Sequence, residues 1–353
     1  MGKKRIRLVD NSRATPSVSV FFGCPERCLE TVIWYPTEPA SGNGESCDVC
    51  EGAPVLASSA AYPLVVYCHG FFGSPEENVS LCTQLAAQGY VVAAVQFPLT
   101  SSSSATTPQM CDVPNQPGDV SFVIDRILSG ADGQLADLAV CVNPLRIGVV
   151  GFSVGGLTSA LVGLVPGFKD PRISSVVNLA GPLCPVPESK YCPGETTALF
   201  VYGTSDAVVP FEPNGWAPFH RNGGRSVYLP LPGGTHQGFS EIQILPVPKR
   251  EHPDGPSCNF IRIGFNREEL ARVLHQCDLL SDIETPANCP DPCPCEILES
   301  HRTIDARVQQ SFVRHCVLNF LDVTLRGNTK AAQGLRRRTD AVFSAQFKSL
   351  YFA

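Results

Sequence analysis

The stretch Gly151-Phe152-Ser153-Val154-Gly155-Gly156 has the residue types and spacing of a nucleophile site. A serine at a sharp strand-to-helix turn needs small residues two before and two after it, because larger side chains would collide with the strand and the helix. Glycine occupies both positions, an apolar run at 147–150 precedes them, and a helix-like segment follows. We therefore predict that Ser153 is a nucleophile and that the backbone N–H of Val154 stabilises a developing oxyanion.

A carboxylate and a histidine follow the serine, each directly after a predicted strand. Asp206 lies beyond the apolar strand at 197–202, and His236 follows the strand at 226–231, whose Pro230 suits the edge of a sheet. A histidine in this setting can accept the proton of the serine while the aspartate orients its ring. Each residue alone would equally suit a helix cap, a loop cap or a polar surface site, but their order along the chain favours a catalytic triad.

The loop Tyr67-Cys68-His69-Gly70-Phe71-Phe72-Gly73 follows a predicted strand at 64–66. A site that transfers acyl groups needs a second oxyanion donor at this place. We expect the backbone N–H of Phe71 to be that donor and His69 to support the loop. Ligation of a metal by His69 is the less favoured alternative.

Aromatic side chains near these loops are candidate substrate contacts. They are Phe72, Phe152 and Trp216, and they favour an acyl or aromatic ester over a charged or sugar-like substrate. Phe72 and Phe152 would equally suit packing at the top of the sheet. The loop at 100–117, rich in Ser, Thr and Pro, is expected to border the same site.

The elements that must position these residues alternate between strands and helices. Ser74-Pro75-Glu76-Glu77 predicts a capping box that starts a helix ending at Gly89, and a strand at 90–97 follows. We expect an α/β fold with a mostly parallel central sheet flanked by helices. Two antiparallel strands at 17–22 and 29–35 would open it, and an amphipathic helix at 304–325 would close it, with a shared face made of Val308, Phe312, Cys316, Phe320 and Leu321.

Taken together, these motifs resemble the dienelactone-hydrolase-like and platelet-activating-factor-acetylhydrolase-like branch of the α/β-hydrolase superfamily, and cutinase-like polyester hydrolases share the layout. The resemblance covers about residues 15–240 and the final helix. It implies an α/β-hydrolase fold and a serine esterase, with Ser153 as nucleophile, His236 as general base and acid, Asp206 as orienting acid, and Phe71 and Val154 as oxyanion donors. Two features depart from it: dienelactone hydrolases use a cysteine nucleophile, and the cysteine-rich stretch after His236 has no counterpart.

Composition narrows the remaining possibilities. With 353 residues, 43% of them hydrophobic, we expect one domain over 1–353, carrying insertions at about 38–61 and 241–303. A formal net charge of −6 without a basic block argues against nucleic acid as a partner. No apolar stretch reaches the ~18 residues of a membrane helix, and no phosphate loop or dinucleotide motif predicts an organic cofactor. We expect a monomer.

Sixteen cysteines, many in loops, favour disulfides and hence a secreted or periplasmic protein, although the basic start lacks the apolar core of a signal peptide. Plausible bridges join cysteines that are close in sequence: Cys24 with Cys28, Cys184 with Cys192, and Cys68 with Cys82. Structural zinc is the alternative, with candidate ligands Cys47, Cys50, Cys289, Cys293 and Cys295, but their spacing is irregular.

The function predicted from these observations is hydrolysis of small or polymeric carboxylic esters through an acyl-enzyme on Ser153. The insertion at 241–303, with a helix expected at 267–280, would be a lid, a disulfide-stapled cover or a plain surface elaboration. A mobile apolar lid would favour a lipase or phospholipase-type acyl hydrolase. A catalytically silent binding protein on a hydrolase fold is the alternative outside enzymes.

Overall fold

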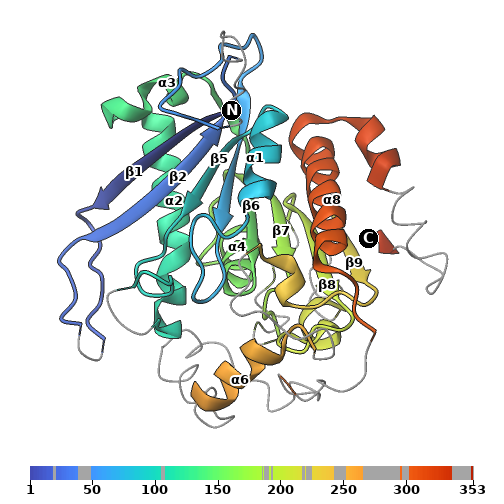
Figure 1. Cartoon of the computed structure of the whole chain (residues 1–353). Coiled ribbons are helices and arrows are strands. Elements are labelled where there is room, and N and C mark those ends of the chain that lie inside the picture. Colours follow the sequence, from blue (N-terminus) through green and yellow to red (C-terminus); the bar gives the residue numbers. More distant parts are fainter. Residues whose placement is uncertain are drawn as a thin grey trace.

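A mostly parallel sheet forms the centre of the molecule, and helices cover both of its faces (Figure 1). The computed structural model describes residues 1–18, 21–38, 49–104, 108–184, 186, 191, 194–216, 219, 225–241, 252–264, 295, 302–335 and 351–352. Within them the sheet has ten strands in the order β10-β9-β8-β7-β6-β4-β5-β2-β1-β3. The strands are β1 Gly2–Asp10, β2 Arg27–Tyr35, β3 Cys50–Glu51, β4 Tyr62–Cys68, β5 Val91–Val95, β6 Val142–Phe152, β7 Ile173–Leu179, β8 Thr197–Gly203, β9 Ser226–Leu231 and β10 Tyr351–Phe352.

Strands β5, β4, β6, β7, β8 and β9 are mutually parallel, whereas β2 and β10 join this block in antiparallel fashion. Every residue of β4 and of β5 is buried, as expected where a parallel sheet is covered on both faces. This confirms the predicted α/β architecture with a mostly parallel central sheet.

The helices form two layers. Helices α2 and α4 pack together on one face of the sheet, and α1 and α8 pack on the other (Figure 1). The α-helices are α1 Val79–Ala87, α2 Gln116–Ser129, α3 Ala136–Ala139, α4 Val154–Leu164, α6 Gly255–Gly264 and α8 Ala306–Arg326. Shorter 3-10 turns are η1 Met110–Asn115, η2 Gly133–Leu135 and η5 Gln237–Phe239, and η4 Glu212–Trp216 is a π turn. Among the described residues, no helix combines the length and the apolar character that crossing a membrane requires.

Strand β4 lies where the strand order changes direction, with β5 on one side and β6 on the other. The ends of β4 and β6 are adjacent, since Cys68 is paired with Gly151. Open α/β sheets bind ligands at such a switch point, outside the carboxyl ends of the strands. The loops after β4, β6, β8 and β9 carry all the predicted triad and oxyanion residues.

The first strand begins at residue 2 and not at residue 17 as predicted. β1 pairs with β2 from Gly2↔Tyr35 to Asp10↔Arg27, whereas the described residues of 17–22 form only a bridge between Val18 and Phe21. The basic residues at the start conceal an alternating strand pattern in which Ile6 and Leu8 are buried. A half-buried strand tolerates charge on its outer face, so the basic residues at the start are compatible with a strand.

The predicted capping box at 74–77 does not form, and α1 begins only at Val79. Its N-cap residue Asn78 makes no side-chain cap bond. Instead, both carboxylate oxygens of Glu241, 161 residues away, accept the Ser80 N–H at 3.0 Å. A carboxylate at this end also interacts favourably with the helix dipole. The cap of α1 is therefore a tertiary contact, which the local sequence cannot predict.

Two predictions near the carboxyl end of the chain are corrected. Val308 of α8 is 60% exposed and does not belong to the buried face, where Gln309 takes its place. Strand β9 is not the edge of the sheet, because β10 pairs with it at Tyr228 and Val227. Pro230, two residues further along β9, lacks the N–H that a ladder bond would need.

Two of the predicted disulfides are wrong, since Cys24, Cys28, Cys68 and Cys82 are free thiols. Cys68 and Cys82 are fully buried in the apolar core and pack there as small hydrophobic side chains. Cys111 and Cys184 are each disulfide-bonded. The predicted partner of Cys184, Cys192, lies outside the described residues.

A bridge that the sequence did not suggest joins Cys258 of α6 to Cys295. It removes Cys295 from the predicted zinc ligands, while Cys47, Cys289 and Cys293 lie outside the described residues. Among the residues described, no group of three or more His, Cys, Asp or Glu side chains could hold a metal ion. The helix predicted at 267–280 and most of the insertion at 241–303 also lie outside the described residues.

Candidate active site

Ser153 lies on the turn between β6 and α4 with φ 52° and ψ −124°. A positive φ is unusual for a residue with a side chain and is the strained conformation of a nucleophile elbow. Its N–H donates to the Leu179 carbonyl at 2.9 Å, which fixes the turn against β7. A Cβ at Gly155 would lie 2.1 Å from the Cys68 carbonyl oxygen, so this position requires glycine. Val154 begins α4, and its N–H belongs to the first helical turn, where no intrahelical carbonyl accepts it.

The structure brings the three predicted triad side chains together. His236 Nε2 lies 3.0 Å from Ser153 Oγ, and His236 Nδ1 lies 2.8 Å from Asp206 Oδ2. Asp206 and His236 are each 4% exposed, whereas Ser153 is only partly buried and can be reached from the solvent side. These distances suit proton transfer from the serine through the imidazole.

The Asp206 carboxylate is held by its own loop. Its Oδ1 accepts the N–H groups of Val208 at 2.9 Å and Val209 at 2.7 Å, which leaves Oδ2 for the histidine. Burial raises the pKa of the Asp206 carboxyl above its usual value, and the contact with His236 opposes that rise. The contact between Asp206 Oδ2 and His236 Nδ1 orients the imidazole ring.

The electrostatic environment of His236 favours its charged form. Burial lowers the pKa of the imidazole, but the charge and hydrogen bond of Asp206 more than offset this, and Asp254 and Glu77 raise the pKa further. The net effect is a raised pKa, which suits a group that must accept a proton from serine and later release it. The ring of Phe152 packs on the imidazole, with centroids 4.9 Å apart.

Asp254 was not predicted, yet it connects the loops of the acid and the histidine. It is fully buried and accepts three backbone N–H groups: Ala207 at 3.0 Å and His236 at 3.0 Å on Oδ2, and Gln237 at 2.8 Å on Oδ1. The sequence holds one signal that was missed, since Asp254-Gly255-Pro256 combines a cap residue with a proline at the start of a helix. Its tertiary role has no local signature.

Gln309 of α8 was also missed and holds the residue before the histidine. Its Oε1 accepts the Thr235 N–H at 3.0 Å, and its Nε2 donates to the Thr235 carbonyl at 2.8 Å. The side chain is completely buried. A polar residue within the buried stripe of an amphipathic helix indicates such a buried hydrogen bond, and this is the signal that could have identified it.

The loop after β4 is fixed by His69 and Glu77. The Phe97 N–H donates to His69 Nε2 at 3.1 Å, so Nδ1 carries the proton and donates to the Gly70 carbonyl at 2.7 Å. Burial lowers the pKa of His69 to about 4, which keeps the ring neutral. Both ring nitrogens therefore contact backbone, as expected of a residue that supports the loop. Phe72 has φ 64° and donates its N–H to the Thr100 carbonyl at 2.8 Å, which fixes the loop beside Phe71.

Glu77 lies beneath the same loop. Its Oε2 accepts the Gly70 N–H at 2.9 Å and the Tyr67 hydroxyl at 3.0 Å, and the side chain is buried. Burial raises the pKa of the Glu77 carboxyl to about 7, although both hydrogen bonds and the charge of His236 oppose the rise. The residue predicted to cap a helix is therefore a buried carboxyl group in contact with the predicted oxyanion loop.

The predicted substrate contacts lie in different environments. Phe72 is 45% exposed, whereas Phe152 is 4% exposed and packs against His236 and Phe239. Phe152 thus has a packing role, which is the alternative that the sequence left open for it. The backbone of Trp216 ends η4, and its side chain lies outside the described residues. Contact of these side chains with a substrate remains a prediction.

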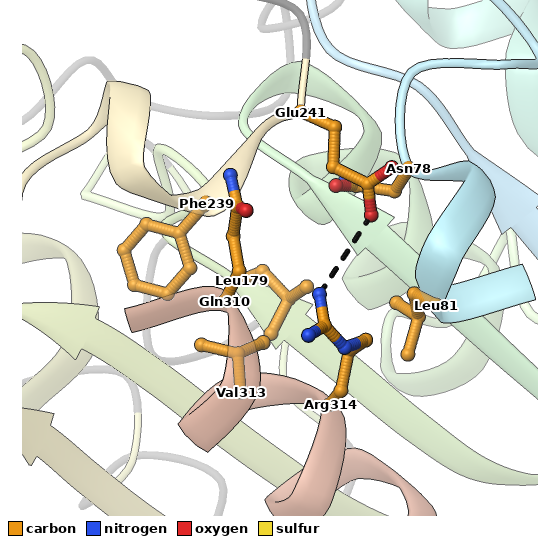
Figure 2. A pocket seen from close by; sticks show the side chains of 8 residues that line it. All are labelled: Asn78, Leu81, Leu179, Phe239, Glu241, Gln310, Val313 and Arg314. Atoms are coloured by element: carbon orange, nitrogen blue, oxygen red, sulfur yellow. Dashed lines mark ion pairs between the residues drawn. The ribbon is translucent and has the colours of Figure 1, made fainter. Parts of the chain in front are cut away.

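A small pocket lies behind the histidine loop, between α1 and α8. Figure 2 shows Arg314 of α8 facing Glu241 across it, with 4.0 Å between Nη1 and Oε1. The pocket has room for about one water molecule, which is too little for an acyl group. Its lining is Asn78, Leu81, Leu179, Phe239, Glu241, Gln310, Val313 and Arg314. The pocket is therefore a packing gap beside the histidine loop and not a substrate site.

Comparisons with known proteins agree with this architecture. Residues 37–125, which include the loop after β4 and end before Ser153, match the family described as platelet-activating factor acetylhydrolase, isoform II. A ferulic acid esterase from Streptomyces cinnamoneus has a similar structure, with a TM-score of 0.57, 22% identity, and coverage of 93% of this chain and 90% of that one.

Esterase 2 from Thermogutta terrifontis is similar at a TM-score of 0.47 and 17% identity, covering 81% of this chain and 96% of that one. Proteins with curated descriptions yield no match. The chain has the α/β-hydrolase fold, which confirms that prediction. Its stretch 37–125 resembles the platelet-activating-factor-acetylhydrolase branch of that fold.

Proposed function

We propose that this chain is a serine hydrolase that cleaves carboxylic esters through an acyl-enzyme on Ser153. The observation that carries the proposal is the continuous contact from Ser153 Oγ through His236 to Asp206, at 3.0 Å and 2.8 Å. A serine hydroxyl is a weak nucleophile unless an adjacent base removes its proton, and here the base is in position and is itself oriented by a carboxylate.

In the acylation step, Ser153 Oγ attacks the ester carbonyl carbon while His236 Nε2 takes the hydroxyl proton. The resulting imidazolium is stabilised by Asp206, and the backbone N–H groups of Val154 and Phe71 donate to the oxyanion. The imidazolium then gives its proton to the departing alkoxide, the carbon–oxygen bond of the ester breaks, and the alcohol leaves.

In the deacylation step, His236 removes a proton from water, and the hydroxide oxygen attacks the acyl carbon. Collapse of the second oxyanion breaks the bond to Ser153 Oγ, which recovers its proton from the imidazolium. The products are a carboxylic acid and the free enzyme. The raised pKa of His236 means that the base form is lost at low pH, so kcat/KM falls on the acidic side.

Two observations support an ester as the substrate. The family matched over 37–125 is named for an acetylhydrolase, and the similar fold from Streptomyces cinnamoneus is named a ferulic acid esterase. The exposed Phe72 beside the loop of Phe71 suits an apolar or aromatic acyl group. We take short-acyl or polyester-type esters as the substrate class, whether small molecules or polymers.

The test is hydrolysis of p-nitrophenyl esters from acetate to palmitate by the chain and by its Ser153→Ala variant. We expect turnover that is lost by at least about 10³-fold in the variant, because removal of the nucleophile leaves only binding and the oxyanion donors. Equal rates in both proteins, or none in either with the fold intact, would contradict the proposal and favour a binding protein.

The same series separates two kinds of esterase. A maximum at acetate or butyrate supports the short-acyl substrate class, and a maximum at palmitate identifies a lipase-type enzyme. Secretion and a monomeric state remain predictions, the first supported by the disulfides of Cys258–Cys295, Cys111 and Cys184.

A further inference from the structure

We infer that the segment around α6, from Asp254 to the Cys258–Cys295 bridge, is a clamp that positions the acid and histidine loops, with Asp254 as a positioning residue for His236. The inference rests on the proposed function and extends it to the part of the cysteine-rich insertion that the structure describes. It assigns to this part a role in catalysis that differs from that of a lid or a surface elaboration.

The Asp254 carboxylate is the centre of the clamp. Its Oδ2 accepts the N–H of Ala207, next to the triad acid, and the N–H of His236 itself, both at 3.0 Å, and its Oδ1 accepts Gln237 N–H at 2.8 Å. One rigid side chain thus ties together two loops that carry different triad members. A shift of Asp254 would change the distance between His236 and Asp206, and misplacement of a catalytic group by 1 Å can reduce the rate about 100-fold.

The disulfide fixes α6 to the loop of the triad acid. Cys258 and Cys295 are buried with Ala207 in a small apolar cluster. Cys295 N–H donates to the Ala207 carbonyl at 2.5 Å, and the Cys258 N–H donates to the Asp254 carbonyl at 2.9 Å. Both backbone groups of Ala207 are therefore held by this segment, the N–H by Asp254 and the carbonyl by Cys295.

The negative charge of Asp254 also raises the pKa of His236, which is a second effect of the clamp. Three carboxyl groups act on the imidazole, namely Asp206 by direct contact and Asp254 and Glu77 at longer range. His252 lies next to Asp254, with 3.9 Å between Nδ1 and Oδ2, and accepts its backbone N–H. A buried carboxylate near the imidazole stabilises the imidazolium that forms during catalysis. A residue that only stabilised the fold would have no such effect on the titration of His236.

The decisive variant is Asp254→Asn in the full chain, compared with Asp170→Asn. The amide keeps the size of the carboxylate but has only one acceptor oxygen for three donors, and it carries no charge. Asp170 is the matched control, because it is a buried carboxylate that also accepts a backbone N–H, that of Arg172 at 2.9 Å, and it lies in the α4–β7 loop away from the triad.

For Asp254→Asn we expect kcat on p-nitrophenyl acetate to fall about 10- to 100-fold with KM within about twofold. The acidic limb of kcat/KM should move to lower pH, since a carboxylate that raised the pKa of His236 has lost its charge. Asp170→Asn should show neither change. A folded Asp254→Asn variant with wild-type kcat and an unmoved acidic limb would overturn the inference.

A readout without substrate separates this inference from the proposed function. The imidazole of His236 is titrated by NMR in ¹³C-histidine-labelled protein, with His236→Gln identifying its signal. A lower pKa in Asp254→Asn than in the wild type supports the clamp even where no ester is hydrolysed, and an equal pKa contradicts it. Loss of turnover in the wild type itself counts against the proposed function alone.

The bridge is tested by Cys258→Ala/Cys295→Ala, with the free thiols Cys24→Ala/Cys141→Ala as the control pair. We expect a loss of kcat in the same direction as for Asp254→Asn and an unchanged control. Circular dichroism establishes that each variant is folded. Wild-type kcat in the folded bridge variant would show that the disulfide is no part of the clamp.

Discussion

The loop after β4 is held by a carboxyl group from its own segment, whereas the loops of Asp206 and His236 share a carboxylate that belongs to neither loop. Two buried carboxyl groups show the contrast. Glu77 accepts the N–H of Gly70, seven residues before it, while Asp254 reaches back 18 residues to His236 and 47 to Ala207. Each satisfies buried backbone N–H groups, but only the first does so within one local segment.

The difference shows that one half of the site can be read from a contiguous motif and the other half depends on tertiary packing. Small residues and a positive φ define the serine turn wherever it occurs. The backbone at Thr235 and His236 is fixed by Asp254 and by Gln309 of α8, the latter 74 residues away from Thr235. We expect substitutions at the serine turn to impair folding of that turn. Substitutions that remove the contacts of the histidine loop should instead change the alignment of His236 with Ser153 and Asp206.

The largest effect is expected at the serine turn. Gly155→Ala places a Cβ 2.1 Å from the Cys68 carbonyl oxygen and 2.6 Å from that of His69, and the Cys68 backbone cannot move without opening the β4–β6 pairing. We expect loss of soluble folded protein or a fall in kcat of about 10³-fold. Expression, circular dichroism and p-nitrophenyl acetate turnover measure it.

The control is Gly133→Ala, because nothing lies within 4 Å of a Cβ placed at that glycine. It should match the wild type in expression and turnover. A fully active Gly155→Ala variant would show that the serine turn accommodates a Cβ. The serine turn would then not be the more constrained half of the site.

The sequence predicts the three triad residues but not the distant residues that hold their loops. Ser153, Asp206 and His236 were identified from turn chemistry and order, and the structure places the three side chains within hydrogen-bonding distance. For Glu77 the sequence predicts a helix cap, because its spacing from Ser74 fits a capping box. In the folded structure the Glu77 carboxylate instead lies beneath Gly70 and accepts its N–H, and only the tertiary fold shows this.

The central sheet was predictable for a related reason. Continuous apolar runs with glycine at their ends define β4, β5, β6 and β8, and these strands lie within a residue or two of the prediction except for the longer start of β6. β1 was missed because its charged residues conceal the strand period, and β10 because two residues carry no period at all. Asp254, Gln309 and Glu241 act only through contacts with distant elements, which a single sequence does not reveal.

An intermediate effect is expected from Gln309→Leu, which weakens the tertiary half. Leucine preserves the volume but leaves the buried N–H and carbonyl of Thr235 without their partner. An unsatisfied buried group costs about 1–3 kcal/mol, so the free energy of unfolding should fall by about 2 kcal/mol or more. Because Thr235 precedes the histidine, kcat should fall about tenfold.

Val308→Ala on the same helix is the control, since that side chain is mostly exposed. Urea denaturation and initial rates are measured for both variants. A Gln309→Leu variant that loses stability but keeps wild-type kcat would show that α8 supports the fold without aligning the triad. The tertiary half would then reduce to Asp254 alone.

The smallest effect on turnover is expected from Glu77→Gln. This variant should instead differ from the wild type in how its free energy of unfolding depends on pH. Glutamine offers an oxygen in the same place for Gly70 N–H and the Tyr67 hydroxyl, so kcat should stay within about twofold. Burial raises the pKa of Glu77 to about 7 in the folded protein, from 4.5. The folded state therefore binds the proton more tightly than the unfolded state does. The stabilisation is complete below about pH 4.5 and is lost as the pH rises through about 7.

Glutamine does not titrate, so the variant lacks this loss. Its free energy of unfolding relative to the wild type should rise between pH 4.5 and 8 by on the order of 3 kcal/mol, the value of a shift of about 2.5 pKa units. Glu76→Gln is the control, because Lys3 and Arg5 lower the pKa of that half-exposed carboxyl and give a small dependence of the opposite sign. Parallel stability curves for Glu77→Gln and the wild type would mean that Glu77 is ionised in the fold. The two buried carboxyl groups, Glu77 and Asp254, would then differ in how far along the chain the N–H groups that they accept lie.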